Sequence, residues 1–223
     1  MNENSPTARS DTADLPQLQQ LALSYAPAAA RQPTLGLLLL DAHLGTLLRQ
    51  MREPVLTQLR LAWWRDTLVK PASHWPQGNQ VLALLAPWRN PAALVPMVDG
   101  WEELVTDDLT PAAIQGFASG RGRGFAELAR QLDLPDAAQA AQDAGRVYAL
   151  ADLLGNISSP AEKAQILQLA GKPSPTAFRL PRPLRPLTVL AGLGARAVAR
   201  GDGHLAAGGG AFALAVRLGL LGR

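Results

Sequence analysis

The sequence predicts an all-α protein, a single-domain helical bundle, from three observations. Alanine and leucine dominate the 223 residues, whereas Tyr and Phe number only 2 and 4, a composition that favours helices. Capping side chains precede proline at Asn90-Pro91, Thr110-Pro111 and Ser159-Pro160, which is typical of helix starts. No alternation of apolar and polar residues persists as it would in a strand.

Asp14 can cap a first helix, and Ser159-Pro-Ala-Glu162 resembles a capping box for a later one. Between Lys172 and Pro186 five prolines interrupt any helix. The glycine-rich stretch 201–210 separates the last two helices. The predicted helices are, in chain order, 14–30, 34–51, 54–70, 79–86, 91–105, 111–131, 136–157, 160–170, 184–200 and 211–221.

We expect residues 1–13 to form a disordered tail and residues 14–223 to form the domain. The tail is polar, so no signal peptide is expected, and no apolar run is long enough to span a membrane. With no cysteine in the chain, disulfides and thiolate metal sites are excluded. A cytoplasmic location follows as the expectation, with peripheral contact at the inner face of the membrane left open.

Positive charge concentrates in the last 45 residues. Seven arginines and one acid, Asp202, give 7 − 1 = +6 there, whereas the preceding residues hold 14 basic and 17 acidic groups, which gives −3. Such a region can meet phosphates, anionic lipid or an acidic partner, or can simply be solvated. Binding to nucleic acid is the least favoured function for this region.

Residues Gly120-Arg-Gly-Arg-Gly124 resemble a phosphate-binding loop, but they lie inside a predicted helix rather than after a strand. The small residues there more plausibly allow close helix contact, and Arg121 and Arg123 are candidates for anion contact. The three histidines show no metal-ligand spacing, so no metal site is predicted from them.

Carboxylates at i and i+4 on facing helices could hold magnesium bound to a diphosphate. Two such pairs are incomplete in this chain. Asp41 is followed four residues later by Gly45, and Asp152 by Asn156.

The segment Arg49 to Asp66 is the most distinctive part of the sequence, with Trp63-Trp64 between arginines. As a helix beginning at Pro54, it places four apolar residues along one side, and three more widen the apolar surface. A wide-faced core helix is the simplest interpretation. The first set is Leu56, Leu59, Trp63 and Val69, and the second is Leu61, Trp64 and Leu68.

Glu53-Pro54, Gln58-Leu59-Arg60-Leu61 and Trp63-Trp64-Arg65-Asp66 resemble the squalene/phytoene synthase family. The resemblance covers roughly residues 18 to 200 and is closest to the bacterial and mitochondrial branch that includes assembly factors of respiratory complex I. It implies a bundle of the isoprenoid synthase type. Active members condense two prenyl diphosphates head to head with magnesium held by two aspartate-rich motifs.

Both motifs are degenerate in this chain. On the helix from Leu38 to Met51, Asp41 is the one aspartate of the first motif that remains. The segment from Gly145 to Ile157 resembles the second motif, but Asp152, Gly155 and Asn156 replace the residues that active members have there. We therefore expect a non-catalytic protein, without a cofactor, that binds a prenyl lipid or docks on a respiratory-complex subunit or a membrane surface. The alternative is an active magnesium-dependent prenyltransferase.

The resemblance assigns candidate roles to eight residues. For the alternative, Asp41 and Asp152 are the candidate catalytic residues, with magnesium as cofactor. The candidate residues for binding a prenyl diphosphate are Arg49, Arg52, Arg60, Trp63, Trp64 and Asn156.

Overall fold

The computed structural model describes residues 14–50, 53–106 and 108–222, and the part of the chain that it describes is helical without strands. This confirms the all-α class. The α-helices are α2 (Gln17–Ser24), α3 (Ala28–Gln50), α4 (Pro54–Leu68), α5 (Gln80–Leu85), α6 (Val95–Glu102), α7 (Pro111–Gln131), α8 (Ala138–Asn156), α9 (Pro160–Ala170), α10 (Arg185–Arg200) and α11 (Gly209–Leu221). Short 3-10 helices cover Ala72–His74, Pro91–Leu94, Pro135–Ala137 and Arg182–Leu184.

Side-chain caps set two helix starts where the sequence predicts them. Thr110 accepts a hydrogen bond from the Ala113 amide at 3.2 Å, and Ser159 accepts one from the Glu162 amide at 3.4 Å. In each case proline occupies the first helical position, where no N–H is needed. The bounds predicted for α7 and α9 are therefore confirmed.

The N-terminal helices differ from the prediction. The helix expected at 14–30 ends at Ser24, a turn follows, and α3 begins at Ala28 and continues through Pro33. Pro16, not Asp14, occupies the N-cap position of α2. At Asn90-Pro91 a 3-10 turn forms first, and α6 begins only at Val95.

Helix α7 is the centre of the bundle, and it packs on α6 and α8 through glycines. A Cβ added at Gly120 would lie 2.7 Å from the Gly100 Cα of α6, and one at Gly122 would lie 2.6 Å from the Gln142 carbonyl of α8. Backbones approach this closely only where no side chain intervenes. The small residues of 116–124 thus allow helix contact, as the sequence suggests.

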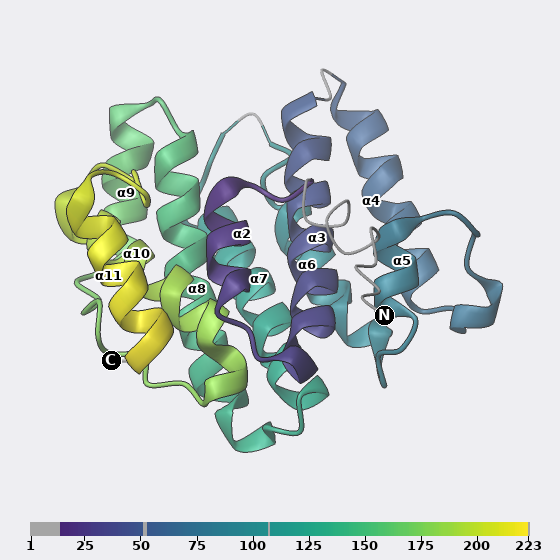
Figure 1. Ribbon diagram of the computed structural model, residues 1–223. Helices are drawn as coiled ribbons and strands as arrows, with labels where there is room; N and C mark the ends of the chain where they lie inside the picture. The colour runs from purple at the N-terminus through teal and green to yellow at the C-terminus, as the bar shows by residue number, and fades with distance from the viewer. Residues whose placement is uncertain (1–13, 51–52, 107, 223) are drawn as a thin grey trace.

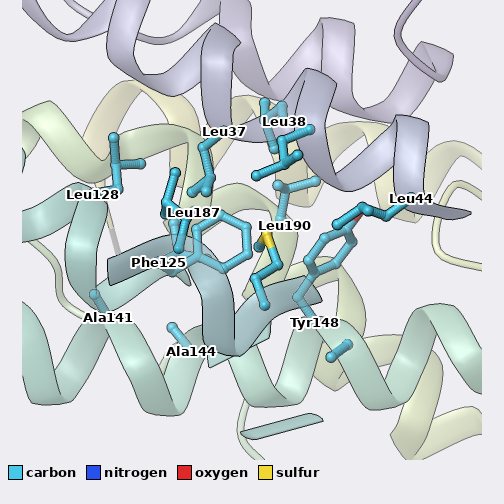
Figure 2. Packing of buried hydrophobic residues seen from close by; sticks show 14 of the residues in the cluster. Leu37, Leu38, Leu44, Phe125, Leu128, Ala141, Ala144, Tyr148, Leu187 and Leu190 are labelled. Carbon is cyan, nitrogen blue, oxygen red and sulfur yellow. The ribbon is translucent and has the colours of Figure 1, made fainter. Parts of the chain in front are cut away.

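The core around α7 draws on helices far apart in the chain. Figure 2 shows Leu37 and Leu38 of α3 facing Phe125 of α7, with Leu187 and Leu190 of α10 beside them. All five side chains are buried. Helices α4 and α5 lie at one end of the bundle and α9 to α11 at the other (Figure 1).

Among the described residues, no helix is both long and apolar enough to cross a membrane.

Candidate functional site

The side chain of Arg121 lies at the centre of the bundle. It projects from the middle of α7 between Gly120 and Gly122, and it is only 1% exposed. Since the two glycines bring α6 and α8 against α7, the guanidinium is enclosed between helices instead of reaching solvent.

Arg121 joins the two aspartates that the sequence singles out. Its Nη2 lies 2.5 Å from Oδ2 of Asp41 on α3, and its Nη1 lies 2.8 Å from Oδ2 of Asp152 on α8. The indole Nε1 of Trp101, on α6, donates to Oδ1 of Asp41 at 2.9 Å. Asp41 is 1% exposed, whereas Asp152 is 33% exposed and reaches the surface of the site.

Three aromatic rings surround the guanidinium. Its central carbon lies 5.1 Å from the Trp101 ring centroid, 5.2 Å from that of Phe117 and 4.7 Å from that of Tyr148. Ring faces attract cations at these distances. The hydroxyl of Tyr148 accepts a hydrogen bond from Nε2 of Gln19 at 2.9 Å, which connects α2 to the site.

Electrostatics keep Arg121 charged. Burial by itself lowers the pKa of the guanidinium, but the negative charges of Asp41 and Asp152 outweigh it, and the net shift is upward. Burial also raises the pKa of Asp41, against the attraction of Arg121. Taken as ionised, the cluster of two carboxylates and one guanidinium carries a net charge of −1.

A cavity of about 290 Å³ lies beside this cluster. Most of its lining is apolar, and its polar groups are the carboxylate of Asp152, the guanidinium of Arg49 and the amide of Asn156. The lining residues are Gly45, Leu48, Arg49, Trp101, Leu104, Phe117, Asp152, Leu153, Asn156 and Ile157. The chain thus brings four of the predicted site residues together, namely Asp41, Asp152, Arg49 and Asn156.

The carboxylate missing at position 45 has no free space. A Cβ at Gly45 would lie 2.9 Å from the Trp101 ring, and Gly155 is packed as tightly, since a Cβ there would lie 2.6 Å from the Gly203 carbonyl. Asn156 turns back to donate to the Asp152 carbonyl oxygen at 2.8 Å. In the part of the chain that the structure describes, no group of three or more His, Asp or Glu side chains could hold a metal ion.

Trp63 and Trp64 lie elsewhere, on the other side of α3. Trp64 is buried with its ring edge-on to His43 and Trp63, at centroid distances of 5.2 and 5.1 Å. Trp63 and Arg60 are exposed. A smaller cavity of about 200 Å³ is lined by His43, Leu47, Arg60, Trp63, Trp64 and Asn79.

The predicted binding residues therefore divide between two cavities that share no lining residue. Arg52 lies outside the described residues. The prediction that one wide face of the helix beginning at Pro54 is core is wrong for four of its seven members, because only the second set packs inward. Buried are Leu61, Trp64 and Leu68, and exposed are Leu56, Leu59, Trp63 and Val69.

Sequence reasoning proposes Arg121 only as an anion contact and does not single out its enclosing rings. The signal was present, because an arginine flanked by glycines inside a helix is a side chain whose neighbours permit close packing. The sequence does not show that Arg121 pairs with Asp41 and Asp152, because these residues lie 80 and 31 positions away from it. Trp101 precedes Glu102 and Glu103 in the sequence, and no local pattern marks it as a neighbour of Arg121.

We compared the chain with protein-family models, with curated proteins and with solved structures, and none of them matches it.

Proposed function

We propose that this chain is a non-catalytic, isoprenoid-synthase-type protein, similar to the squalene/phytoene synthase family, that binds a prenyl lipid in the 290 Å³ cavity. The observation that supports it is the Arg121 guanidinium between Asp41 and Asp152. In the family that the sequence resembles, carboxylates at these places hold magnesium.

Arg121 acts as a fixed counter-ion for both carboxylates. Magnesium requires near-octahedral oxygen ligands, and here Asp41 already spends both oxygens on Arg121 and Trp101. The guanidinium stays protonated at neutral pH, so its positive charge remains between the two carboxylates, where a magnesium ion would have to bind. A metal would have to separate a buried ion pair, which is costly.

The cavity suits an apolar chain with a polar head. Its volume of about 290 Å³ is near the lower end for small-molecule sites, roughly 300 to 1,000 Å³. Leu48, Leu104, Phe117 and Leu153 offer apolar walls. Arg49, which is exposed and donates to Thr46 Oγ1 at 3.2 Å, offers a positive charge for an anionic head group.

Calorimetric titration with farnesol and with a non-hydrolysable farnesyl diphosphate analogue tests the proposal. We expect both to bind with equal affinity in magnesium and in EDTA, and Leu48→Trp to abolish binding by filling the cavity. The matched control is Leu59→Trp, on the exposed side of α4, which should bind as the wild type does. Loss in both variants, or no binding by the wild type, would contradict the proposal.

The second candidate function is a magnesium-dependent prenyltransferase. It is favoured by the partial exposure of Asp152 at the cavity and by the convergence of Asp41 and Asp152 from separate helices. It predicts release of pyrophosphate from farnesyl or geranylgeranyl diphosphate that requires magnesium and is lost in Asp152→Asn. An Asp152→Asn variant as active as the wild type would exclude this role for the residue.

A further inference from the structure

Helix α11 exposes large apolar side chains to solvent, although packing against the bundle would favour burying them. The residues that it buries are mostly small, namely Ala211, Ala215, Leu218 and Gly219. Phe212 and Leu220, in contrast, are 63% and 68% exposed, and Leu221 is exposed as well. Phe212, Val216 and Leu220 follow one another at intervals of four residues along one face, and Val216 is half-buried.

The small residues explain how α11 is held in place. A Cβ added at Gly219 would overlap the ring of Tyr25, and one added at Gly192 of α10 would overlap the Leu218 side chain. The helix is therefore docked closely on α2 and α10. Its outward face needs a separate explanation, because exposing a phenyl ring and a leucine to water contributes nothing to folding.

Three arginines lie beside α11 or at its ends. Arg217 lies on α11 and is exposed, Arg196 approaches Gly210 at the start of the helix, and Arg185 approaches Gly222 at its end. Among the described residues from 179 to 222, the one acid is Asp202, which is paired with Arg200 at 2.8 Å. Within the described part of the chain, Arg185, Arg196 and Arg217 form no ion pair, and Arg196 donates a hydrogen bond to the Ala207 carbonyl oxygen at 3.3 Å.

A groove of about 440 Å³ runs beside the exposed face. It combines two guanidinium groups with apolar walls, which is the pairing that a phosphate head group and its acyl chain would contact. The lining residues are Pro175, Thr176, Arg196, Gly210, Ala213, Leu214 and Arg217.

We propose that α11, with Phe212, Val216 and Leu220 inserted and Arg185, Arg196 and Arg217 around them, docks this protein on an anionic phospholipid surface. Helices that lie in a membrane interface combine an apolar face with flanking Lys or Arg in this way. Each arginine near an anionic leaflet adds attraction within the Debye length. In Figure 1, α11 lies at the edge of the bundle, where a planar surface can reach it.

The exposed apolar stripe of α4 provides an internal comparison. Val55, Leu59 and Trp63 are exposed there too. However, Glu53 and Asp66 offset Arg60, and Arg65 is paired with Asp99 and Glu102. That stripe lacks the charge excess that selects an anionic surface. It lies at the opposite end of the bundle from α11 (Figure 1).

Co-sedimentation of the full chain with lipid vesicles tests the proposal, with phosphatidylcholine alone compared with phosphatidylcholine containing phosphatidylglycerol. We expect binding to the anionic vesicles only, and weaker binding as salt increases. Phe212→Glu/Leu220→Glu should bind roughly a hundredfold more weakly, and Arg217→Glu roughly thirtyfold more weakly. Since all three residues are exposed, the variants should melt at the wild-type temperature.

Leu59→Glu on α4 is the matched control and should bind as the wild type does. Leu48→Trp, which fills the prenyl-lipid cavity, should also retain vesicle binding, so the two proposals can fail independently. Absence of wild-type binding to anionic vesicles, or full binding by the α11 double variant, would overturn the inference. Sedimentation velocity adds a further check, because a dimer that dissociates in Phe212→Glu/Leu220→Glu would assign the face to a second copy of the chain.

Discussion

Nη2 of Arg121 lies 2.5 Å from Oδ2 of Asp41, and both side chains are 1% exposed. A buried pair of this kind is costly to form and still more costly to break, because removing one partner leaves the other charge without compensation. Asp152 and the Trp101 indole complete the arrangement. The cluster therefore ties α3, α6, α7 and α8 together.

Breaking the pair from one side should be severely destabilising. Arg121→Met leaves two carboxylates without their counter-ion, and we expect a loss of about 3–5 kcal/mol in the free energy of unfolding. Arg121→Met/Asp41→Asn should recover part of that loss, because Trp101 keeps an acceptor and no unpaired charge stays buried at position 41. Urea denaturation of both single variants and the double variant measures the coupling, and additive losses would contradict the ion pair.

Close contact between α6 and α7 should make Gly120 far more sensitive than Gly116. A methyl group at Gly120 meets backbone atoms of Pro96 and Gly100, which cannot move aside, whereas the three atoms nearest to one at Gly116 all belong to the flexible Glu103 side chain. We expect Gly120→Ala to cost about 3 kcal/mol or more and Gly116→Ala less than about 1 kcal/mol. Equal melting temperatures for the two variants would be inconsistent with the packing.

Restoring an aspartate at position 45 should not restore a metal site. The Trp101 ring fills the space next to Gly45, and moving it would break its hydrogen bond to Asp41. We expect Gly45→Asp to gain no affinity for magnesium and Gly45→Ala to lose roughly 1–3 kcal/mol of stability. Gly209→Ala, where a Cβ meets nothing within 4 Å, is the control. Calorimetry with magnesium and thermal denaturation give the two readouts.

The pKa of His43 should make stability depend on pH. Partial burial, followed by the positive charge of Arg60, lowers this pKa below its ordinary value of 6.5. Between the folded pKa and 6.5 the unfolded chain binds more protons, so this contribution is present above pH 6.5 and is lost as the pH falls. Because His43 remains partly exposed, we expect the effect to be small and reduced by salt.

NMR titration of the His43 ring measures that pKa directly. Arg60→Gln should raise it by removing the nearby charge, and His43→Gln should flatten the pH dependence of stability below 6.5. An unchanged His43 pKa in Arg60→Gln would contradict the electrostatic cause.

Local chemistry made several elements predictable from the sequence. Thr110-Pro111 and Ser159-Pro160 each carry a cap and a proline within two adjacent residues, so the starts of α7 and α9 needed no tertiary information. The boundary between α2 and α3 could not be predicted in this way. Pro33 looks like a helix boundary in the sequence, yet α3 continues through it.

The candidate site was only half predictable. Degenerate motif spacing identified Asp41 and Asp152, but no local pattern shows that Arg121 fills the space between them. On α4 the sequence offers apolar residues on both sides, and the packing of α3 and α6 decides that Trp64 is buried while Trp63 is exposed. Periodicity fixes only the angle between two neighbouring residues, not which of them faces the core.

Magnesium dependence of ligand binding tests the central claim most directly. We would titrate the purified chain with a non-hydrolysable farnesyl diphosphate analogue by calorimetry, once with magnesium and once with EDTA. If Arg121 takes the place of the metal, the two affinities should agree. Binding that appears only with magnesium, and disappears in Asp152→Asn, would show that the carboxylates still hold a metal and would contradict the non-catalytic assignment.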